Sequence, residues 1–220
     1  MSIGCSASPE KKPVRRKAGR PLDAAKRAAI VDTAAHHFFH HGFAATAIEQ
    51  IAADAGVSKV TIYNQFGDKR ALFTAAVECE CEKMRGYFSL EAMPQGTIRE
   101  RLTVIGEAIF AFLSRPEMIQ FERRIAAETE ADPAIGIAFL EAGPWRMKQG
   151  FGAWLARSCA LGELKIDDPI LAAEQFVSMC KGMGDLEHRF GAEVTFTQRD
   201  RRIAGAVDVF LAAYGAAENR

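Results

Sequence analysis

The chain has 220 residues, of which 49% are hydrophobic and 25% are charged, a composition typical of a soluble globular protein with one or two domains. No run approaches the ~18 consecutive apolar residues of a membrane span, and the first twenty residues lack the apolar segment of a secretory signal. The five cysteines are odd in number and scattered, which argues against a disulfide framework and favours the reducing cytoplasm.

The charge is distributed unevenly, although the net charge is zero. Residues 1–77 contain 11 Lys or Arg and 6 Asp or Glu, a net charge of +5. Residues 78–220 contain 17 Lys or Arg and 22 Asp or Glu, a net charge of −5. We therefore expect the amino-terminal part, and not the acidic remainder, to attract the phosphates of a nucleic acid.

Residues 1–20 are polar and show no apolar periodicity, so we predict that they are disordered in the free protein. Arg16 and Arg20 belong to a group of six basic side chains that follow the single acid Glu10. Such a basic arm can lie along DNA phosphates or enter the minor groove, as homeodomain arms do. A tail that serves only solubility is the alternative.

A first helix is predicted from a cap at Asp23 to about His41, and Gly42 ends it. Its core stripe consists of Ala28, Val31, Ala34, Ala35 and Phe38. The histidines at positions 36, 37, 40 and 41 form two i, i+4 pairs, a spacing that can hold a metal ion. Because no carboxylate or cysteine nearby in the sequence completes a coordination shell, we predict structural or surface roles and no metal site.

The stretch from Thr46 to Leu72 predicts two short helices joined by a tight turn, followed by the start of a third helix. Thr46 and Glu49 match a capping box, and Gly56 is placed to supply a left-handed C-cap. The first helix carries an apolar stripe of Ile48, Ile51, Ala52 and Ala55.

Ser58 is predicted to cap the second helix, whose inward face consists of Val60, Ile62 and Phe66. Its outward face is polar and consists of Ser58, Lys59, Thr61, Asn64 and Gln65, with Tyr63 close by. This is the layout of a helix-turn-helix, in which the second helix can enter the major groove of double-stranded DNA. An ordinary helical hairpin is the alternative, since short helix pairs around a glycine are common.

The segment IAADAGVSKVTIYNQFGDKRAL closely resembles the signature of the TetR family of bacterial transcriptional regulators, and the resemblance covers roughly residues 15 to 75. It implies that Tyr63 and Lys69 contact DNA phosphates, which suits side chains that fix register without reading bases. The candidate DNA-contacting set is Arg16, Arg20, Thr46, Ser58, Lys59, Thr61, Tyr63, Asn64, Gln65 and Lys69.

Beyond this motif the chain predicts only helices. A fourth helix should run from a cap at Asp68 to about Phe88, with a break at Pro94-Gln95-Gly96. Further helices are expected over 97–114, 117–129, 133–143 (opened by Asp132-Pro133), 145–160, 169–182 (opened by a cap at Asp168 with Pro169) and, from a capping box of Thr197 and Asp200, to about Ala213. The prediction is therefore an all-α fold with a helix-turn-helix domain over 21–70 and a helical ligand-binding and dimerisation domain over 71–220. Residues 115–144 also resemble a carboxy-terminal domain subtype of TetR-type regulators.

The last two predicted helices carry apolar stripes that favour a homodimer, because a helix that is apolar on two sides must bury both. The candidate interface residues are Phe176, Cys180, Met183, Ile203, Val207, Phe210 and Tyr214. A purely intramolecular helix pair is the alternative. A two-fold dimer is also what reading a palindromic operator requires.

In the TetR family the region between these two ends encloses a small-molecule pocket, so the resemblance implies an effector site there. The candidate pocket residues are Phe88, Phe110, Phe121, Phe139, Trp145, Phe151 and Trp154, although each of them could be ordinary core. We therefore predict a ligand-responsive repressor without cofactor, metal or catalytic residues. The rivals are an enzyme, for which no recognised motif is present, and a DNA-binding protein that needs no effector.

Overall fold

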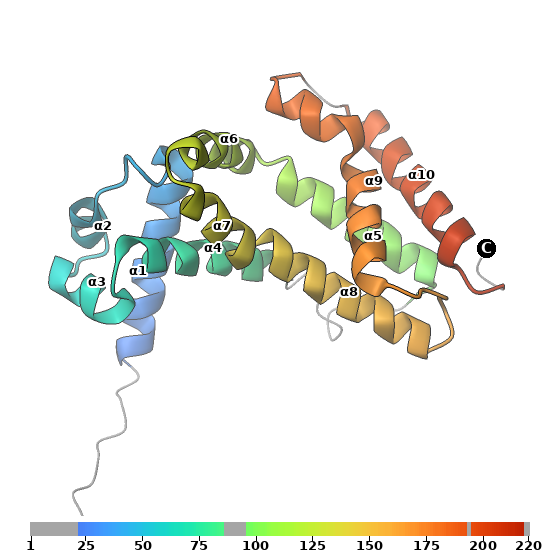
Figure 1. Ribbon diagram of the computed structural model, residues 1–220, viewed down its shortest axis with the longest axis horizontal. Helices are drawn as coiled ribbons and strands as arrows, with labels where there is room; N and C mark the ends of the chain where they lie inside the picture. The colour runs from blue at the N-terminus through green and yellow to red at the C-terminus, as the bar shows by residue number, and fades with distance from the viewer. Residues whose placement is uncertain (1–21, 86–95, 193–194, 218–220) are drawn as a thin grey trace, which may run out of the picture.

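The computed structural model describes residues 22–85, 96–192 and 195–217, which fold into α-helices as predicted (Figure 1). The helices within these ranges are α1 (Leu22–His41), α2 (Ile48–Asp54), α3 (Lys59–Phe66), α4 (Lys69–Arg85), α5 (Ile98–Leu113), α6 (Pro116–Ala131), α7 (Pro133–Ala142), α8 (Pro144–Ala160), α9 (Pro169–Arg189) and α10 (Phe196–Tyr214). The predicted basic arm with Arg16 and Arg20, and the predicted pocket residue Phe88, lie outside the described residues.

Side-chain caps start several of these helices where the sequence predicts them. Ser58, Asp68, Asp132 and Asp168 each accept hydrogen bonds from backbone N–H groups in the first turns of α3, α4, α7 and α9. Capping boxes start α5 at Thr97 and α10 at Thr195. The predicted box of Thr197 with Asp200 is therefore wrong, because Thr195 and Gln198 form the box two residues earlier.

The helix α9 continues to Arg189, beyond the predicted end at Gly182, but it kinks at that glycine. Gly182 has φ 48° and ψ −149°, a backbone conformation that side chains with a Cβ rarely adopt. The Arg202 side chain of α10 lies against the kink, and a Cβ on Gly184 would overlap its guanidinium. The glycines thus let α10 approach the second half of α9.

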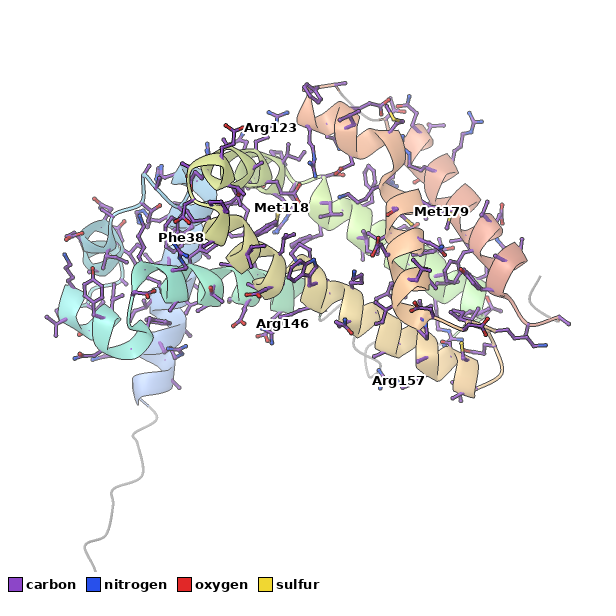
Figure 2. All side chains as sticks on the ribbon, in the orientation of Figure 1. Phe38, Met118, Arg123, Arg146, Arg157 and Met179 are labelled. Atoms are coloured by element: carbon purple, nitrogen blue, oxygen red, sulfur yellow. The ribbon has the colours of Figure 1, made fainter. Side chains whose placement is uncertain are left out.

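Two hydrophobic cores hold the helices together, and the first one crosses the predicted domain boundary at residue 70. It joins α1 to α4 with α6 and α7 through fully buried rings such as Phe73, Phe121 and Phe38, the last of which is labelled in Figure 2. Burying each such ring contributes about 1.5–3 kcal/mol, so the helix-turn-helix is fastened to α6 and α7 by packing as well as by chain connectivity. In α1, Ile30 belongs to this core, whereas Ala28, predicted to be buried, is exposed.

The second core lies among α5, α8, α9 and α10, at the end of the molecule opposite α2 and α3 (Figure 1). Phe176 of α9 packs edge-on against Phe210 of α10, with ring centroids 5.2 Å apart. The α4 helix runs from the helix-turn-helix along α7 towards this second unit. The arrangement places α2 and α3 at one end of the molecule and a helical bundle at the other.

Candidate nucleic-acid interface and internal cavity

The turn between α2 and α3 has the geometry of a helix-turn-helix. Gly56 adopts φ 65°, and Val57 N–H donates to the carbonyl oxygen of Ala52 at 2.9 Å, which closes the end of α2. Ile48, Ile51 and Ile62 are buried, so α2 and α3 are packed down on the first core. The opposite face of α3 is left to solvent.

This exposed face of α3 carries Lys59, Val60, Tyr63 and Asn64. Val60 is 65% exposed, so its predicted inward position is wrong. The short α3 buries only Ile62 completely, and Val60 falls beside Asn64 on the free side. The face therefore combines side chains that can hydrogen-bond to base edges with one apolar side chain that can contact a thymine methyl group.

The other candidate side chains of α3 face its edges. Thr61 is half-buried, and its hydroxyl lies 2.9 Å from that of Ser58, whose Oγ caps the helix. Gln65 is half-buried too, and its backbone carbonyl accepts a hydrogen bond from Arg27 at 3.2 Å. The Ser58 and Thr61 side chains therefore support the start of α3.

Lys59 is paired with Glu49 of α2 through a direct ion pair, and its ammonium lies 5.7 Å from the centroid of the Tyr63 ring. The hydrogen bond between the two charged groups raises the pKa of Lys59 and lowers the pKa of Glu49. Both groups are exposed, so a DNA phosphate or base can compete with Glu49 for the ammonium.

Thr46 is buried, and its hydroxyl lies 2.6 Å from the carbonyl oxygen of Gly42 and 3.2 Å from that of His37. The N-cap of α2 is Ala47, which makes no side-chain cap, so the predicted capping box of Thr46 with Glu49 is wrong. Thr46 is corrected from a DNA-contacting residue to one that fixes the loop between α1 and α2.

Lys69 and Tyr63, which the resemblance assigns to phosphates, have different surroundings. Tyr63 is 40% exposed beside Lys59. Lys69 is half-buried, with its ammonium 3.3 Å from the carbonyl oxygen of Ala44 and 4.6 Å from the centroid of the Phe43 ring. Burial lowers the pKa of Lys69, and the carboxylate of Glu128 opposes this shift.

The rings of the four histidines of α1 lie near one another, with His36 next to His37 and His40, and His37 next to His41. His37 is buried, and its Nε2 lies 2.7 Å from a carboxylate oxygen of Asp54, a contact that ties α1 to α2. The rings of His36 and His40 approach to 4.4 Å between centroids. Within the ranges that the structure describes, no three His, Cys, Asp or Glu side chains are grouped so that they could hold a metal ion.

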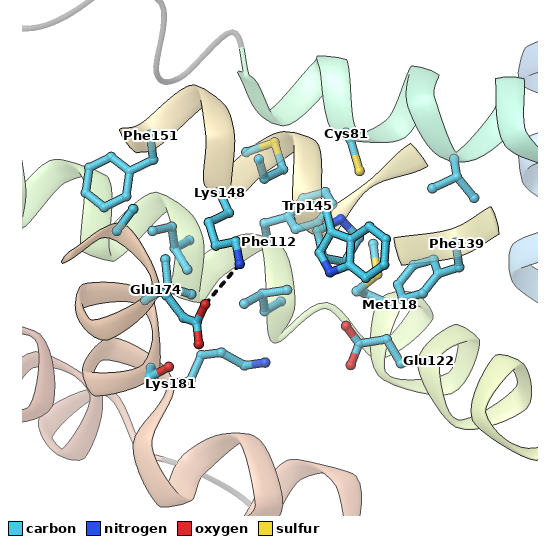
Figure 3. A pocket seen from close by; sticks show the side chains of 18 of the residues that line it. Cys81, Phe112, Met118, Glu122, Phe139, Trp145, Lys148, Phe151, Glu174 and Lys181 are labelled. Carbon is cyan, nitrogen blue, oxygen red and sulfur yellow. Dashed lines mark hydrogen bonds and ion pairs between the residues drawn. The ribbon is translucent and has the colours of Figure 1, made fainter. Parts of the chain in front are cut away.

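A cavity of about 420 Å³ lies at the junction of α4 to α9 (Figure 3). Its volume falls in the range of small-molecule sites. Most of its wall is apolar and is formed by Phe39, Val77, Cys81, Ile109, Phe112, Leu113, Met118, Phe139, Pro144, Trp145, Met147, Phe151, Ala173 and Val177. The polar groups of the lining are Glu122, Lys148, Glu174, Ser178 and Lys181.

The charged groups of the cavity are paired at its edges. Lys148 Nζ lies 3.0 Å from Glu174, and a carboxylate oxygen of Glu122 lies 3.1 Å from the guanidinium of Arg189. Burial raises the pKa of Glu122, although Lys181 and Arg189 oppose the shift. Such a site suits a mainly apolar molecule with one or two polar groups at its ends.

The predicted pocket set is partly wrong. Trp145, Phe151 and Phe139 line the cavity. Phe121 is fully buried in the first core and Trp154 packs on Phe151 in the second. Phe110 faces a separate shallow hollow beside His188. Helical spacing shows which side chains turn inward, but it cannot tell a filled core from a gap between helices, and for the same reason it misses Met118 and Glu122.

The predicted dimer set is also largely corrected. Phe176, Cys180, Ile203, Val207 and Phe210 are buried within the protomer, where α9 and α10 pack on α5 and α8. The apolar spacing of 4-3-4 on α10 therefore describes an intramolecular seam. Only Met183 is well exposed, while Tyr214 is half-buried and donates from its hydroxyl to Gln175 at 2.6 Å.

The fold and the exposed α3 define a helix-turn-helix DNA-binding regulator with a helical second unit. Comparison with family models makes the assignment specific. A model of bacterial regulatory proteins of the tetR family matches residues 30–76, and one of the AefR-like transcriptional repressor carboxy-terminal domain matches residues 100–216. The chain belongs to the TetR family of transcriptional regulators.

Solved structures support the same assignment. A TetR-family regulator from Mesorhizobium loti is 26% identical, with a TM-score of 0.75 over 90% of this chain and 100% of that one. The flavonoid-responsive regulator FrrA is 28% identical, with a TM-score of 0.70 over 88% and 99%. SmeT, the repressor of the Stenotrophomonas maltophilia multidrug efflux pump SmeDEF, is 24% identical and shares the fold, with a TM-score of 0.58 over 88% and 92%. A comparison with curated proteins gave no match. Among the helices of the described ranges, none has the length and apolar character of a membrane span.

Proposed function

We propose that this chain is a cytoplasmic repressor that binds a palindromic operator in double-stranded DNA as a homodimer and is released by a small, mainly apolar effector. The observation that carries the proposal is the pairing of an exposed helix-turn-helix face with a cavity of about 420 Å³ in the same rigidly connected chain. A DNA-binding protein that does not respond to an effector needs no such cavity.

In the proposed complex, α3 lies in the major groove and presents Lys59, Val60 and Asn64 to base edges. Tyr63 and Lys69 contact phosphates, as the family resemblance implies, and so fix the register of α3 on the duplex. The positive charge of the amino-terminal part supports this orientation, because the remainder of the chain is acidic.

The homodimer is supported by exposed apolar side chains of α9 and α10, the helices at the end of the molecule opposite α2 and α3 (Figure 1). These side chains are Leu171, Met183, Leu186, Val209 and, directly after α9, Phe190. Phe190 is 84% exposed, a costly position for an aromatic ring unless a partner covers it. This surface replaces the buried seam that the sequence predicts as the interface.

For the effector, we propose a flat aromatic compound with hydroxyl groups. The aromatic wall of Phe112, Phe139 and Trp145 suits ring stacking, and Glu122 and Lys148 are placed to bind polar ends. FrrA, which has the same fold, is described as flavonoid-responsive, so flavonoids are the first compounds to test on this chain.

The test selects binding sites from a random duplex library with the purified protein and measures the stoichiometry of the complex. We expect a palindromic consensus occupied by two protomers, and flavonoids that bind in the cavity should weaken that complex. A consensus without two-fold symmetry would contradict the homodimer, and a failure to enrich any sequence would contradict the repressor function.

A further inference from the structure

One helix contacts both the cavity and the DNA-binding motif. At its start, α6 lines the cavity with Met118 and Glu122. At its end, Glu128 accepts hydrogen bonds from the backbone N–H groups of Phe43 and Ala44, each at 3.1 Å. These two amides belong to the loop that leads from α1 into the helix-turn-helix.

Two further contacts fasten the middle of α6 to α1. The guanidinium of Arg124 donates to the backbone carbonyl of Phe39, in the last turns of α1, at 2.9 Å. Phe121 stacks on the Phe39 ring, with centroids 4.0 Å apart and planes inclined by 9°. These contacts hold the middle of α6 on the end of α1, so a molecule that displaces the start of α6 tilts the helix about them and moves Glu128 relative to the loop.

The loop between α1 and α2 leaves space for the Glu128 carboxylate because it begins with a glycine. Gly42 has φ 84°, and a Cβ on it would overlap the Glu128 carboxylate. Ala44 is then held from both sides, since its N–H donates to Glu128 and its carbonyl accepts from Lys69. Lys69 is the side chain that we assign to a DNA phosphate, so the contact chain leads from the cavity wall to the DNA surface.

We infer that Glu128 is a positioning residue that transmits the state of the cavity to the helix-turn-helix by holding the loop at Phe43 and Ala44. A molecule wedged against Met118 and Glu122 shifts α6, withdraws the Glu128 carboxylate from the two amides and frees Lys69 from Ala44. The inference rests on the proposed effector function of the cavity for its biological meaning, but the coupling itself is a property of the free protein.

The test is amide hydrogen exchange of Phe43 and Ala44 in the full chain without DNA or effector. Glu128→Ala should speed exchange of these two amides about tenfold or more, because it removes a charged acceptor. Glu128→Gln, which keeps one acceptor oxygen, should restore most of the protection. Glu130→Ala, an exposed carboxylate in the same turn of α6, is the matched control and should leave the rate unchanged.

The transmission step is tested by filling the cavity from the opposite side. Val177→Trp on α9 adds bulk to the lining, with Val177→Phe as the smaller alternative should the larger ring prevent folding. We expect faster exchange of the two amides in the filled variant and no further acceleration when Glu128→Ala is added, the signature of coupled sites. Unchanged exchange at Phe43 and Ala44 in a folded, filled variant would overturn the inference.

These measurements use neither operator nor effector, so their result is independent of the proposed function. If flavonoids fail to release DNA while cavity filling still frees the loop, the effector proposal fails and the coupling stands. If compounds release DNA but cavity filling leaves the two amides protected, the signal travels by another route and the Glu128 inference is contradicted.

Discussion

The hydroxyl of Thr46 lies 2.6 Å from the carbonyl oxygen of Gly42, and this buried contact closes the loop between α1 and α2. Thr46→Val keeps the shape of the side chain but leaves two buried carbonyls without this donor, at a cost of roughly 1–3 kcal/mol. Thermal unfolding should show a melting temperature lowered by several degrees, while Thr46→Ser should remain close to wild type. A fully stable Thr46→Val protein with weakened operator binding would instead place the hydroxyl at the DNA.

The loss of a phosphate contact should weaken DNA binding regardless of the base sequence of the DNA. Lys69→Ala and Tyr63→Phe should weaken binding to all duplexes alike, and Lys69→Ala should lower the salt slope by about one ion. Lys26→Ala, which removes an exposed charge from α1, is the control for net charge. A Lys69→Ala protein that changed base preference but bound non-specific DNA normally would refute the phosphate assignment.

The loss of a base contact should weaken binding to the operator and leave binding to unrelated DNA almost unchanged. Asn64→Ala and Val60→Ala remove exposed side chains of α3 without removing its buried anchor Ile62. Each should cost on the order of 1–3 kcal/mol on the selected operator and little on unrelated DNA. Mobility-shift titrations against both duplexes measure this difference. Wild-type operator affinity in both variants would mean that another face of α3 meets the groove.

Substitutions at exposed and at buried positions of α9 distinguish a role in the dimer from a role in the protomer core. Leu186→Glu combined with Met183→Glu places two charges on the exposed apolar surface and should yield folded monomers in sedimentation experiments. Phe176→Ala, which empties a fully buried position, should instead lower the free energy of unfolding of the protomer by about 3–5 kcal/mol. A dimer that survived both charges would place the interface elsewhere.

Glu122 gives the protein a predictable pH dependence. Burial raises the pKa of Glu122 in the folded protein above its value in the unfolded chain, so the folded state holds its proton more tightly. The stability that this proton contributes is present at low pH and is lost as the pH rises through the unfolded and then the folded pKa. The Glu122→Gln variant cannot lose this proton, so it does not lose stability in this way. The difference in unfolding free energy between Glu122→Gln and wild type should therefore rise in favour of the variant as the pH is raised from about 4 to about 8. A constant difference would show that Glu122 is not desolvated.

The local signals in the sequence were sufficient for the fold but not for the cavity. Ser58, Asp68, Asp132 and Asp168 start helices as predicted because an N-cap depends on a few adjacent residues. The failure at Thr46 has a tertiary cause: its hydroxyl found partners at the end of α1.

The errors at Val60 and Phe176 have different causes. Val60 is exposed because it lies two residues before the buried Ile62, about 200° around the helix. Phe176 is buried inside the protomer because α5 and α8 cover the seam that suggested a second subunit. Periodicity identifies an apolar face, but the element that covers it is decided by contacts between distant parts of the chain.

The most direct test of the regulator proposal measures cavity binding and operator release in one titration. Because Trp145 lines the cavity and Trp154 is buried in the second core, a Trp154→Phe variant leaves one reporter at the site. Flavonoids are titrated into its complex with a labelled operator, following tryptophan fluorescence and the anisotropy of the DNA together. We predict that compounds which quench Trp145 also weaken operator binding, by roughly thirtyfold for a coupling of ~2 kcal/mol. Compounds that quench Trp145 fully while the operator remains bound with unchanged affinity would contradict a ligand-responsive repressor.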